Sequence, residues 1–175
     1  MIKKILIKIY LKIINNKKYI SFLRNKGVII GENCDIHKSA DFGSEPYLIS
    51  IGDNVRITQN VKFITHDGGL WVLRNMGIVK KEDVKYGKIV VGNNCNISWN
   101  VIIMPGVTIG NNVVIGAGAI VTKDIPDNMV YAGIPAKKIE TIEEYGNKVK
   151  NQCIPLFSAN RKVKEEKLKQ IFWGK

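Results

Sequence analysis

The sequence predicts an all-β fold in which one long coil of short parallel strands forms the middle of the chain. Two observations support this. Aliphatic residues recur every six positions through two long runs, and glycine often follows them. The runs are separated by residues 67–88, where the period is lost. A period of six fits neither the roughly 3.6 residues of a helical turn nor the alternation of a single strand, but it fits short strands joined by tight turns.

Each repeat can be numbered from its aliphatic residue, which we expect to point into the coil. The first run reads "IGENCD", "IHKSAD" and "FGSEPY", slips by three residues, and continues as "IGDNVR", "ITQNVK" and "FITHDG". The second run reads "VGNNCN", "ISWNVI", "IMPGVT", "IGNNVV", "IGAGAI" and "VTKDIP". The twelve first positions are Ile30, Ile36, Phe42, Ile51, Ile57, Phe63, Val91, Ile97, Ile103, Ile109, Ile115 and Val121.

Two other positions of the repeat also carry a pattern. Glycine or asparagine follows the aliphatic residue, and we attribute this to a turn that needs unusual backbone dihedrals. The fifth position is small or β-branched and is expected to stack between coils. Cys34 and Cys95 both stand there, so they are interpreted as small buried apolar residues without chemistry.

The two ends of the chain lie outside the repeat and are expected to be helical. In residues 1–27, lysines and isoleucines fall on separate helical stripes, which predicts a basic amphipathic helix. It either caps the open end of the coil or lies on an anionic membrane surface. The stripes are Lys4, Lys8 and Lys12 on one side and Ile2, Ile5, Leu6, Ile9 and Ile13 on the other. Residues 141–175 are predicted to form a helical extension with an exposed basic face.

Composition excludes several classes of protein. The 175 residues suit one domain, and 45% hydrophobic content allows a sizeable core. The net charge of +12 gathers at the two ends instead of interleaving with aromatic residues, so a nucleic-acid partner is not expected. Three widely spaced cysteines give neither a disulfide framework nor a zinc site. The lysines within residues 1–14 argue against a transmembrane span or signal peptide, and a cytoplasmic location is expected.

The interruption at residues 67–88 reads "DGGLWVLRNMGIVKKEDVKYGK". Structureless loops of this length are uncommon in a compact domain. The segment mixes apolar residues such as Leu70 and Trp71 with charges, whereas disordered linkers are poorer in apolar residues. An ordered loop is therefore expected, which projects from the coil toward a neighbouring subunit.

The repeats, the "THDGG" interruption, "IMPGVTIGNNVVIGAGAIVTKDIP" and "YAGIPAKKI" together resemble the hexapeptide-repeat acyltransferases, in particular the acetyltransferases that act on sugars and on some antibiotics. The resemblance covers residues 28–140. It implies a left-handed parallel β-helix of triangular section, with three repeats per coil and about four coils. It also implies a homotrimer with active sites between subunits.

The resemblance assigns catalysis to His66, where the coil meets the loop. A neutral imidazole can take the proton of an acceptor hydroxyl, since the ordinary pKa of histidine lies near 6.5. Asp67 either binds a sugar hydroxyl, orients the imidazole or forms a turn. Glu45, in the three-residue slip, either contacts the acceptor or is a solvated loop carboxylate. His37 stands at a turn position and is expected to be solvated.

The resemblance also implies acetyl-CoA as co-substrate, with no metal. Ala117 would hold the pantetheine arm through its amide, Thr122 and Lys123 would flank the nucleotide, and Lys137 would meet phosphate, with Lys138 as a helper. The family commonly has tryptophan where Asn96 stands and a small residue where Trp99 stands. Trp99 is therefore expected either to line the thioester pocket or to narrow the channel.

These expectations lead to one principal function and several alternatives. The principal function is an enzyme that acetylates a hydroxyl of a sugar or glycan intermediate of a surface polysaccharide. An acetyltransferase for a streptogramin-type antibiotic or a small amine is the alternative, and a non-catalytic scaffold is a third. Carbonic anhydrases on this coil need three histidines, whereas the chain has two. A serine acetyltransferase would need a longer helical domain before the coil. The remaining partner expected is a membrane surface, through residues 1–27.

Overall fold

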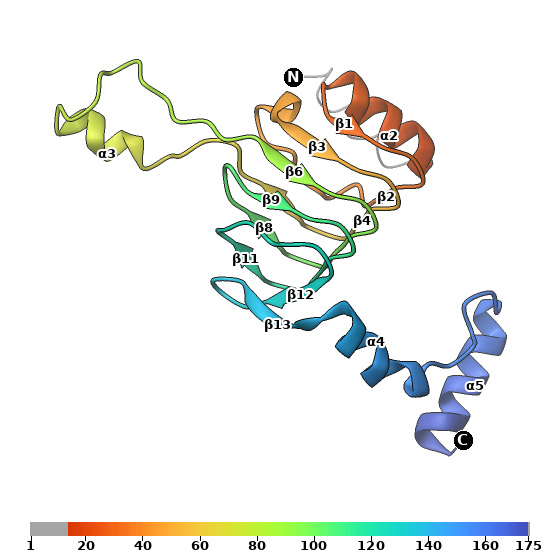
Figure 1. Ribbon diagram of the computed structural model, residues 1–175. Helices are drawn as coiled ribbons and strands as arrows, with labels where there is room; N and C mark the ends of the chain where they lie inside the picture. The colour runs from red at the N-terminus through yellow and green to blue at the C-terminus, as the bar shows by residue number, and fades with distance from the viewer. Residues whose placement is uncertain (1–13, 175) are drawn as a thin grey trace. The chain divides into compact units, whose positions relative to one another are not determined.

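The computed structural model describes residues 14–174. They fall into two units, divided between Tyr145 and Gly146. The first unit holds the repeats. Short parallel strands are stacked into three sheets that the chain visits in a fixed order (Figure 1). The first sheet has the order β1-β3-β6-β9, the second β2-β4-β7-β10 followed by β12 and β13, and the third β5-β8-β11. This confirms the predicted stack of parallel strands.

The strands are two to five residues long. Those of the first sheet are β1 (Ile29–Ile30), β3 (Ile49–Ile51), β6 (Ile89–Val91) and β9 (Thr108–Ile109). Those of the second are β2 (Asp35–Ile36), β4 (Arg56–Ile57), β7 (Asn96–Ile97), β10 (Val114–Ile115), β12 (Met129–Ala132) and β13 (Lys137–Thr141). Those of the third are β5 (Lys62–Phe63), β8 (Ile102–Ile103) and β11 (Ile120–Val121).

The core is built by the first and fifth positions of the repeat. All twelve first-position residues are buried, as predicted. Fifth-position side chains such as Val61, Val101 and Ala119 are buried beside them. Because each coil places its aliphatic residues over those of the next, apolar side chains fill the interior continuously.

The glycines at the second position have a different role from the one predicted. The left-handed backbone falls two residues later, at the fourth position, where Asn54, Asn94 and Asn112 have φ values of 56°, 54° and 56°. Among the second-position glycines only Gly43, with φ of 63°, has the predicted unusual dihedrals; the others, such as Gly92, are needed because neighbouring coils approach closely. A Cβ on Gly92 would lie 2.6 Å from the carbonyl oxygen of Gly110. The turn therefore divides the two requirements between glycine and asparagine.

The asparagines at this turn also join the coils to one another. The side-chain amide of Asn94 donates to Asn112 at 2.8 Å, and Asn112 donates to Asn128 at 2.8 Å. Left-handed backbone suits asparagine better than other residues with a side chain. The interpretation of the cysteines holds for Cys95, which is buried, but Cys34 is only half-buried because it lies beside the edge strand β2, with a neighbouring coil on one side.

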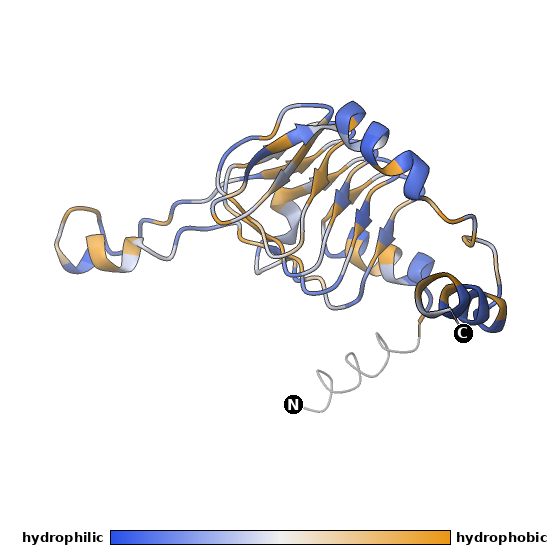
Figure 2. Cartoon of the chain, turned by 90° about the horizontal axis from the view of Figure 1, so that it is seen from below, coloured by the Kyte–Doolittle hydropathy of each residue, from blue (hydrophilic) through white to orange (hydrophobic). Residues whose placement is uncertain are grey.

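The interruption between the two runs is an ordered loop that projects away from the coil (Figure 1). It contains the helix α3 (Leu70–Asn75). The chain leaves and returns side by side, since Asp67 N–H donates to the Lys85 carbonyl and Gly87 N–H to the Thr65 carbonyl, both at 2.9 Å. Hydrophobic residues gather on the projecting part (Figure 2). The exposed ones include Trp71, Val72, Met76 and Ile78.

The helix α2 (Asn16–Asn25) covers the start of the coil. Its side chains Tyr19, Ile20 and Leu23 are buried in the same apolar cluster as the first strands. This agrees with a capping role for residues 14–27. The lysine and isoleucine stripes predicted within residues 1–13 lie outside the described residues, so the predicted membrane contact stays a prediction.

At the other end of the coil the chain departs from the parallel pattern. Strand β13 pairs antiparallel with β12, because the chain reverses at Gly133, which has φ of 95°. The helices α4 (Ile142–Val149) and α5 (Arg161–Trp173) follow, joined by the 3₁₀ turn η2 (Lys150–Gln152), and a similar turn η1 (Pro46–Leu48) fills the earlier slip. None of the helices in residues 14–174 is long and apolar enough to span a membrane.

Candidate active site

The site is built where the third sheet turns into the first, a region we call the third corner: residues 43–48, 64–88, 104–107 and 122–124. His66 stands there, just after β5, at the root of the projecting loop. Its backbone pairs antiparallel with Tyr86 on the returning strand of the loop. The two rings meet edge to face with centroids 6.3 Å apart. The His66 side chain is 45% exposed, so the imidazole is held on one side and open on the other.

Glu45 holds the imidazole from the previous coil. Its Oε2 lies 3.0 Å from His66 Nδ1 and accepts the hydroxyl of buried Thr65 at 2.6 Å. The side chain of Glu45 is only 13% exposed. Hydrogen bonds from Thr65, His66 and Ser44 lower the pKa of the Glu45 carboxyl. The group is therefore ionised at neutral pH and can only accept hydrogen bonds.

This geometry fixes the tautomer of the neutral imidazole. Because the Glu45 carboxylate cannot donate, Nδ1 of His66 must carry the proton that joins them. Nε2 then keeps its lone pair, which is the arrangement required of a general base. The same carboxylate would stabilise the imidazolium formed when Nε2 takes a proton.

Asp67 is engaged elsewhere. One carboxylate oxygen accepts the Gly69 N–H at 2.9 Å, and the other lies 3.5 Å from Lys85 Nζ. The bond from Gly69 and then the interaction with Lys85 lower the pKa of Asp67. The sequence left open whether Asp67 orients the imidazole, binds a sugar or forms a turn. The contact to the imidazole is made by Glu45, while Asp67 closes the turn that opens the loop.

A pocket of about 350 Å³ lies in front of His66. Glu45 and His66 line it from the coil, and Asp67 and Gly68 from the start of the loop. The loop supplies the remaining wall, from Trp71, Arg74, Val84 and Tyr86. The interruption in the repeat thus builds an enclosure beside the histidine, with room for part of a small acceptor.

The residues predicted to hold coenzyme A are distributed over two corners and the last strand. Ala117 is exposed where the second sheet turns into the third, which we call the second corner: residues 37–40, 58–61, 98–101 and 116–119. Thr122 and Lys123 are exposed on the third corner, after β11. Lys137 and Lys138 are exposed on β13. One chain therefore brings Thr122 and Lys123 to the corner of His66 but leaves Ala117 on another corner.

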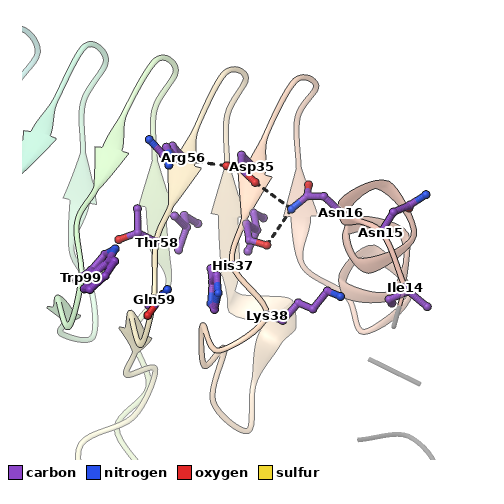
Figure 3. A pocket seen from close by; sticks show the side chains of 12 residues that line it. Ile14, Asn15, Asn16, Asp35, His37, Lys38, Arg56, Thr58, Gln59 and Trp99 are labelled. Carbon is purple, nitrogen blue, oxygen red and sulfur yellow. Dashed lines mark hydrogen bonds and ion pairs between the residues drawn. The ribbon is translucent and has the colours of Figure 1, made fainter. Parts of the chain in front are cut away.

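Trp99 also stands on the second corner, with its side chain turned outward and 54% of the residue exposed. It belongs to a pocket of about 500 Å³ that shares no lining residue with the pocket of His66 (Figure 3). Asn96, where the family commonly has tryptophan, donates from its amide to Ser98 Oγ at 3.1 Å. Sequence reasoning missed the pocket, although His37, Gln59 and Trp99 recur at neighbouring turn positions of the repeat.

Among residues 14–174, no group of three or more histidine, cysteine, aspartate and glutamate side chains could hold a metal ion. The predicted chemistry requires none, since the base is a side chain and the acyl group arrives already activated as a thioester.

Comparison with known proteins identifies the family. Residues 88–123 match the model of the bacterial transferase hexapeptide repeat. The chain is 49% identical over 145 residues to Protein CapG of Staphylococcus aureus, covering 81% of this chain and 82% of CapG. The chain belongs to the hexapeptide-repeat acyltransferase family. It groups with the sugar O-acetyltransferases, being 46% identical over 101 residues to galactoside O-acetyltransferase of Escherichia coli.

Solved structures of acetyltransferases of this family are similar to this chain in sequence and fold. A galactoside acetyltransferase in complex with coenzyme A has 34% identity and a TM-score of 0.58, with 75% of this chain and 73% of that chain covered. A maltose O-acetyltransferase from Clostridium difficile has 40% identity and a TM-score of 0.55 over 66% of this chain and 59% of that one. The match to the Escherichia coli galactoside enzyme covers 57% of this chain and 47% of that enzyme.

Proposed function

We propose that the chain transfers an acetyl group from acetyl-CoA to a hydroxyl of a sugar or glycan intermediate of a surface polysaccharide. The observation that carries this proposal is the Glu45–His66 pair, with Nε2 free, at the edge of a pocket in a hexapeptide-repeat acyltransferase. CapG and the galactoside and maltose O-acetyltransferases are its relatives. Acetyl-CoA is a cytosolic metabolite, so the proposal places the reaction in the cytoplasm.

The reaction follows from the geometry of His66. Nε2 takes the proton of the acceptor hydroxyl while the hydroxyl oxygen forms a bond to the thioester carbonyl carbon. Glu45 stabilises the imidazolium through Nδ1. The carbon–sulfur bond then breaks, and Nε2 gives the proton to the sulfur that leaves. The products are the acetyl ester and coenzyme A. Acyl transfer is direct, so no acetyl group is bound covalently to the protein.

The separation of the two corners supports a homotrimer. Ala117 and His66 stand on different corners of one chain, so we infer that the coenzyme edge of one subunit faces His66 of the next. The exposed apolar residues of the projecting loop, Trp71, Val72, Met76 and Ile78, would pack in that interface.

We also propose that the coil is left-handed and has about four turns, which the relatives of the family support.

The coenzyme would be held by residues of the second corner, the third corner and the last strand, β13. Ala117 is exposed, and among the described residues no hydrogen bond reaches its N–H, which leaves that amide for the pantetheine arm. Thr122 and Lys123 would flank the nucleotide, and Lys137 would meet phosphate with Lys138 beside it. Two related structures were solved with this ligand, one with coenzyme A and one, 28% identical, with acetyl-CoA.

The test is thiol release from acetyl-CoA, measured with sugars, nucleotide sugars, oligosaccharides, a streptogramin and small amines as acceptors. We expect turnover with a sugar acceptor and a fall of about 10²- to 10⁴-fold in kcat for His66→Ala, the usual contribution of a general base. Calorimetry should show that the variant still binds coenzyme A. Exposed Cys153 would react with the thiol reagent, so Cys153→Ser provides a matched control with full turnover and a lower background.

No turnover with any acceptor, together with no binding of coenzyme A, would overturn the proposal and favour a non-catalytic scaffold. Turnover with the streptogramin or amines alone would replace the sugar by that acceptor.

A further inference from the structure

The larger pocket on the second corner shares no lining residue with the pocket of His66. It lies along the outer face of the second sheet, beside the start of α2 (Figure 3). Its volume is about 500 Å³. The polar and aromatic side chains that line it include His37, Thr58, Gln59 and Trp99. They come from three successive coils, so the pocket is a composite of neighbouring turns.

The strand register places Gln59 and Trp99 in one column, and His37 and Thr58 one position earlier in the same turns. Ile36 pairs with Ile57, Ile57 with Ile97, and Ile97 with Ile115. The residues two positions after these isoleucines are therefore stacked at the spacing of neighbouring strands, about 4.8 Å. They are Lys38, Gln59, Trp99 and Ala117. Backbone hydrogen bonds join the same turns, from Asn100 N–H to the Gln59 carbonyl and from Gly118 N–H to the Trp99 carbonyl.

Trp99 thus stands between two different environments. On one side is Ala117, whose amide we assign to the pantetheine arm. On the other side are Gln59 and His37, which line the pocket with Trp99 (Figure 3). A ligand in this pocket would lie on the side of Trp99 that faces away from Ala117 and from the arm that we assign there.

The polar groups on that side are available to a ligand. His37 Nδ1 accepts the Ser39 N–H at 3.2 Å, so the neutral ring carries its proton on Nε2 as a donor. Within the described part of the chain, the Gln59 carboxamide makes no side-chain hydrogen bond and offers both donors and acceptors. Thr58 Oγ1 donates to the Ile97 carbonyl at 3.1 Å and keeps its lone pairs.

An exposed indole beside neutral donors and acceptors matches the chemistry of a pyranose ring. One face of such a ring presents C–H groups that can pack on an aromatic surface, while its hydroxyls seek hydrogen bonds at the edge. A phosphate would need free cations, but both cations of this pocket have interaction partners: Arg56 lies 3.6 Å from Asp35, and Lys38 is engaged as well.

We propose that Trp99, with Gln59 and His37, forms a binding site for a pyranose ring of the acceptor. The indole is the platform, and the amide and imidazole bind hydroxyls. The identification of the sugar as the acceptor rests on the proposed acetyl transfer, whereas the sugar site itself does not. This assigns Trp99 to the acceptor side and not to the thioester pocket.

The first test uses Trp99 as a fluorescent reporter. The variant Trp71→Phe/Trp173→Phe leaves Trp99 as the single tryptophan of the full chain. It is titrated with methyl galactopyranoside, methyl glucopyranoside, coenzyme A, and sorbitol as an open-chain polyol. We expect a saturable change with a pyranoside and none with sorbitol. A response to coenzyme A alone would overturn the proposal.

The second test separates the two ligands by kinetics and binding. Trp99→Ala should weaken sugar binding, measured by saturation-transfer NMR, and raise KM for the sugar, each by about tenfold, with KM for acetyl-CoA changed by less than about twofold. Trp99→Phe should recover most of the loss, and Gln59→Leu should also raise the sugar KM. Circular dichroism checks that each variant is folded. The reverse pattern, a raised KM for acetyl-CoA alone, would assign Trp99 to the coenzyme.

The two proposals fail in different ways. If His66→Ala lowers sugar acetylation as expected but Trp99→Ala leaves sugar binding and KM unchanged, the sugar site is wrong and the proposed function stands. If pyranosides bind at Trp99 but no sugar is acetylated, the sugar site stands and the transferase proposal is wrong.

Discussion

Glu45 Oε2 and His66 Nδ1 lie 3.0 Å apart, although 21 residues separate them in the chain. Between Phe42 and Ile51 the repeat is three residues longer than elsewhere, and Glu45 lies in this irregular turn. His66 lies at the same corner one coil later, where the repeat is interrupted again. The pair is completed by Thr65, whose side chain is buried. Two irregularities of the repeat are therefore brought together by the stacking of coils.

Replacing the carboxylate should slow the reaction without abolishing it. Glu45→Gln keeps the shape of the side chain but no longer stabilises the imidazolium, and its amide can rotate to donate to Nδ1, leaving Nε2 protonated. We expect kcat to fall on the order of 10- to 100-fold, less than for loss of the base. Steady-state thiol release gives the value. Asp67→Asn is the matched comparison and should cost much less, because Asp67 serves the turn. Equal losses in the two variants would contradict this assignment.

The same carboxylate should make stability depend on pH in acid. The pKa of Glu45 is lowered in the folded state, so the unfolded chain binds the proton more readily. The stabilisation is complete above the ordinary glutamate pKa of about 4.3 and is lost as pH falls through the lowered folded value. Denaturant midpoints between pH 6 and pH 3 should fall less steeply for Glu45→Gln than for the wild type. Asp67 and Asp127 also have lowered pKa values, so part of the slope remains. Parallel curves would show that Glu45 does not contribute.

Close approach of the coils should make Gly92 intolerant of any side chain. In Gly92→Ala the new Cβ would meet the carbonyl group of Gly110, which is backbone and cannot rotate away. We expect a loss of about 1–3 kcal/mol of unfolding free energy, measured by denaturant titration. Gly146→Ala is the control, since the residue is inside α4 and no atom beyond the nearby backbone of that helix lies within 4 Å of a Cβ there. It should be neutral or stabilising by up to about 1 kcal/mol. Similar losses for both would refute the close-approach explanation.

Much of the fold could be predicted from the sequence because a solenoid repeats one local pattern. The burial of Ile97 and Ile103 follows from the period alone. The reason for glycine at position two could not be read in this way, since it depends on the distance to the next coil. The antiparallel strand β13 was also missed, because the repeat had ended before it.

The site was predictable in part. His66 was marked by the interruption, and Trp99 by its departure from the family pattern. The contact of Glu45 with His66 could not be predicted, because the sequence does not show how far an irregular turn displaces a side chain. The pocket beside Trp99 was missed for a related reason: His37 appears isolated in the sequence, and the register alone brings it near Gln59 and Trp99.

The positions within one turn of the coil differ in how much change they tolerate. At the fourth position asparagine adopts a left-handed conformation both where the first sheet turns into the second (Asn94) and at the second corner (Asn100), and glycine at the second position meets backbone of the next coil, as at Gly92, so these residue types are dictated. The third position of the second corner, in contrast, carries a lysine, a glutamine, a tryptophan and an alanine in successive coils. That column can be rewritten one coil at a time while the core stays intact. Selectivity for a new acceptor could therefore be engineered, or acquired in evolution, through single exchanges in this column.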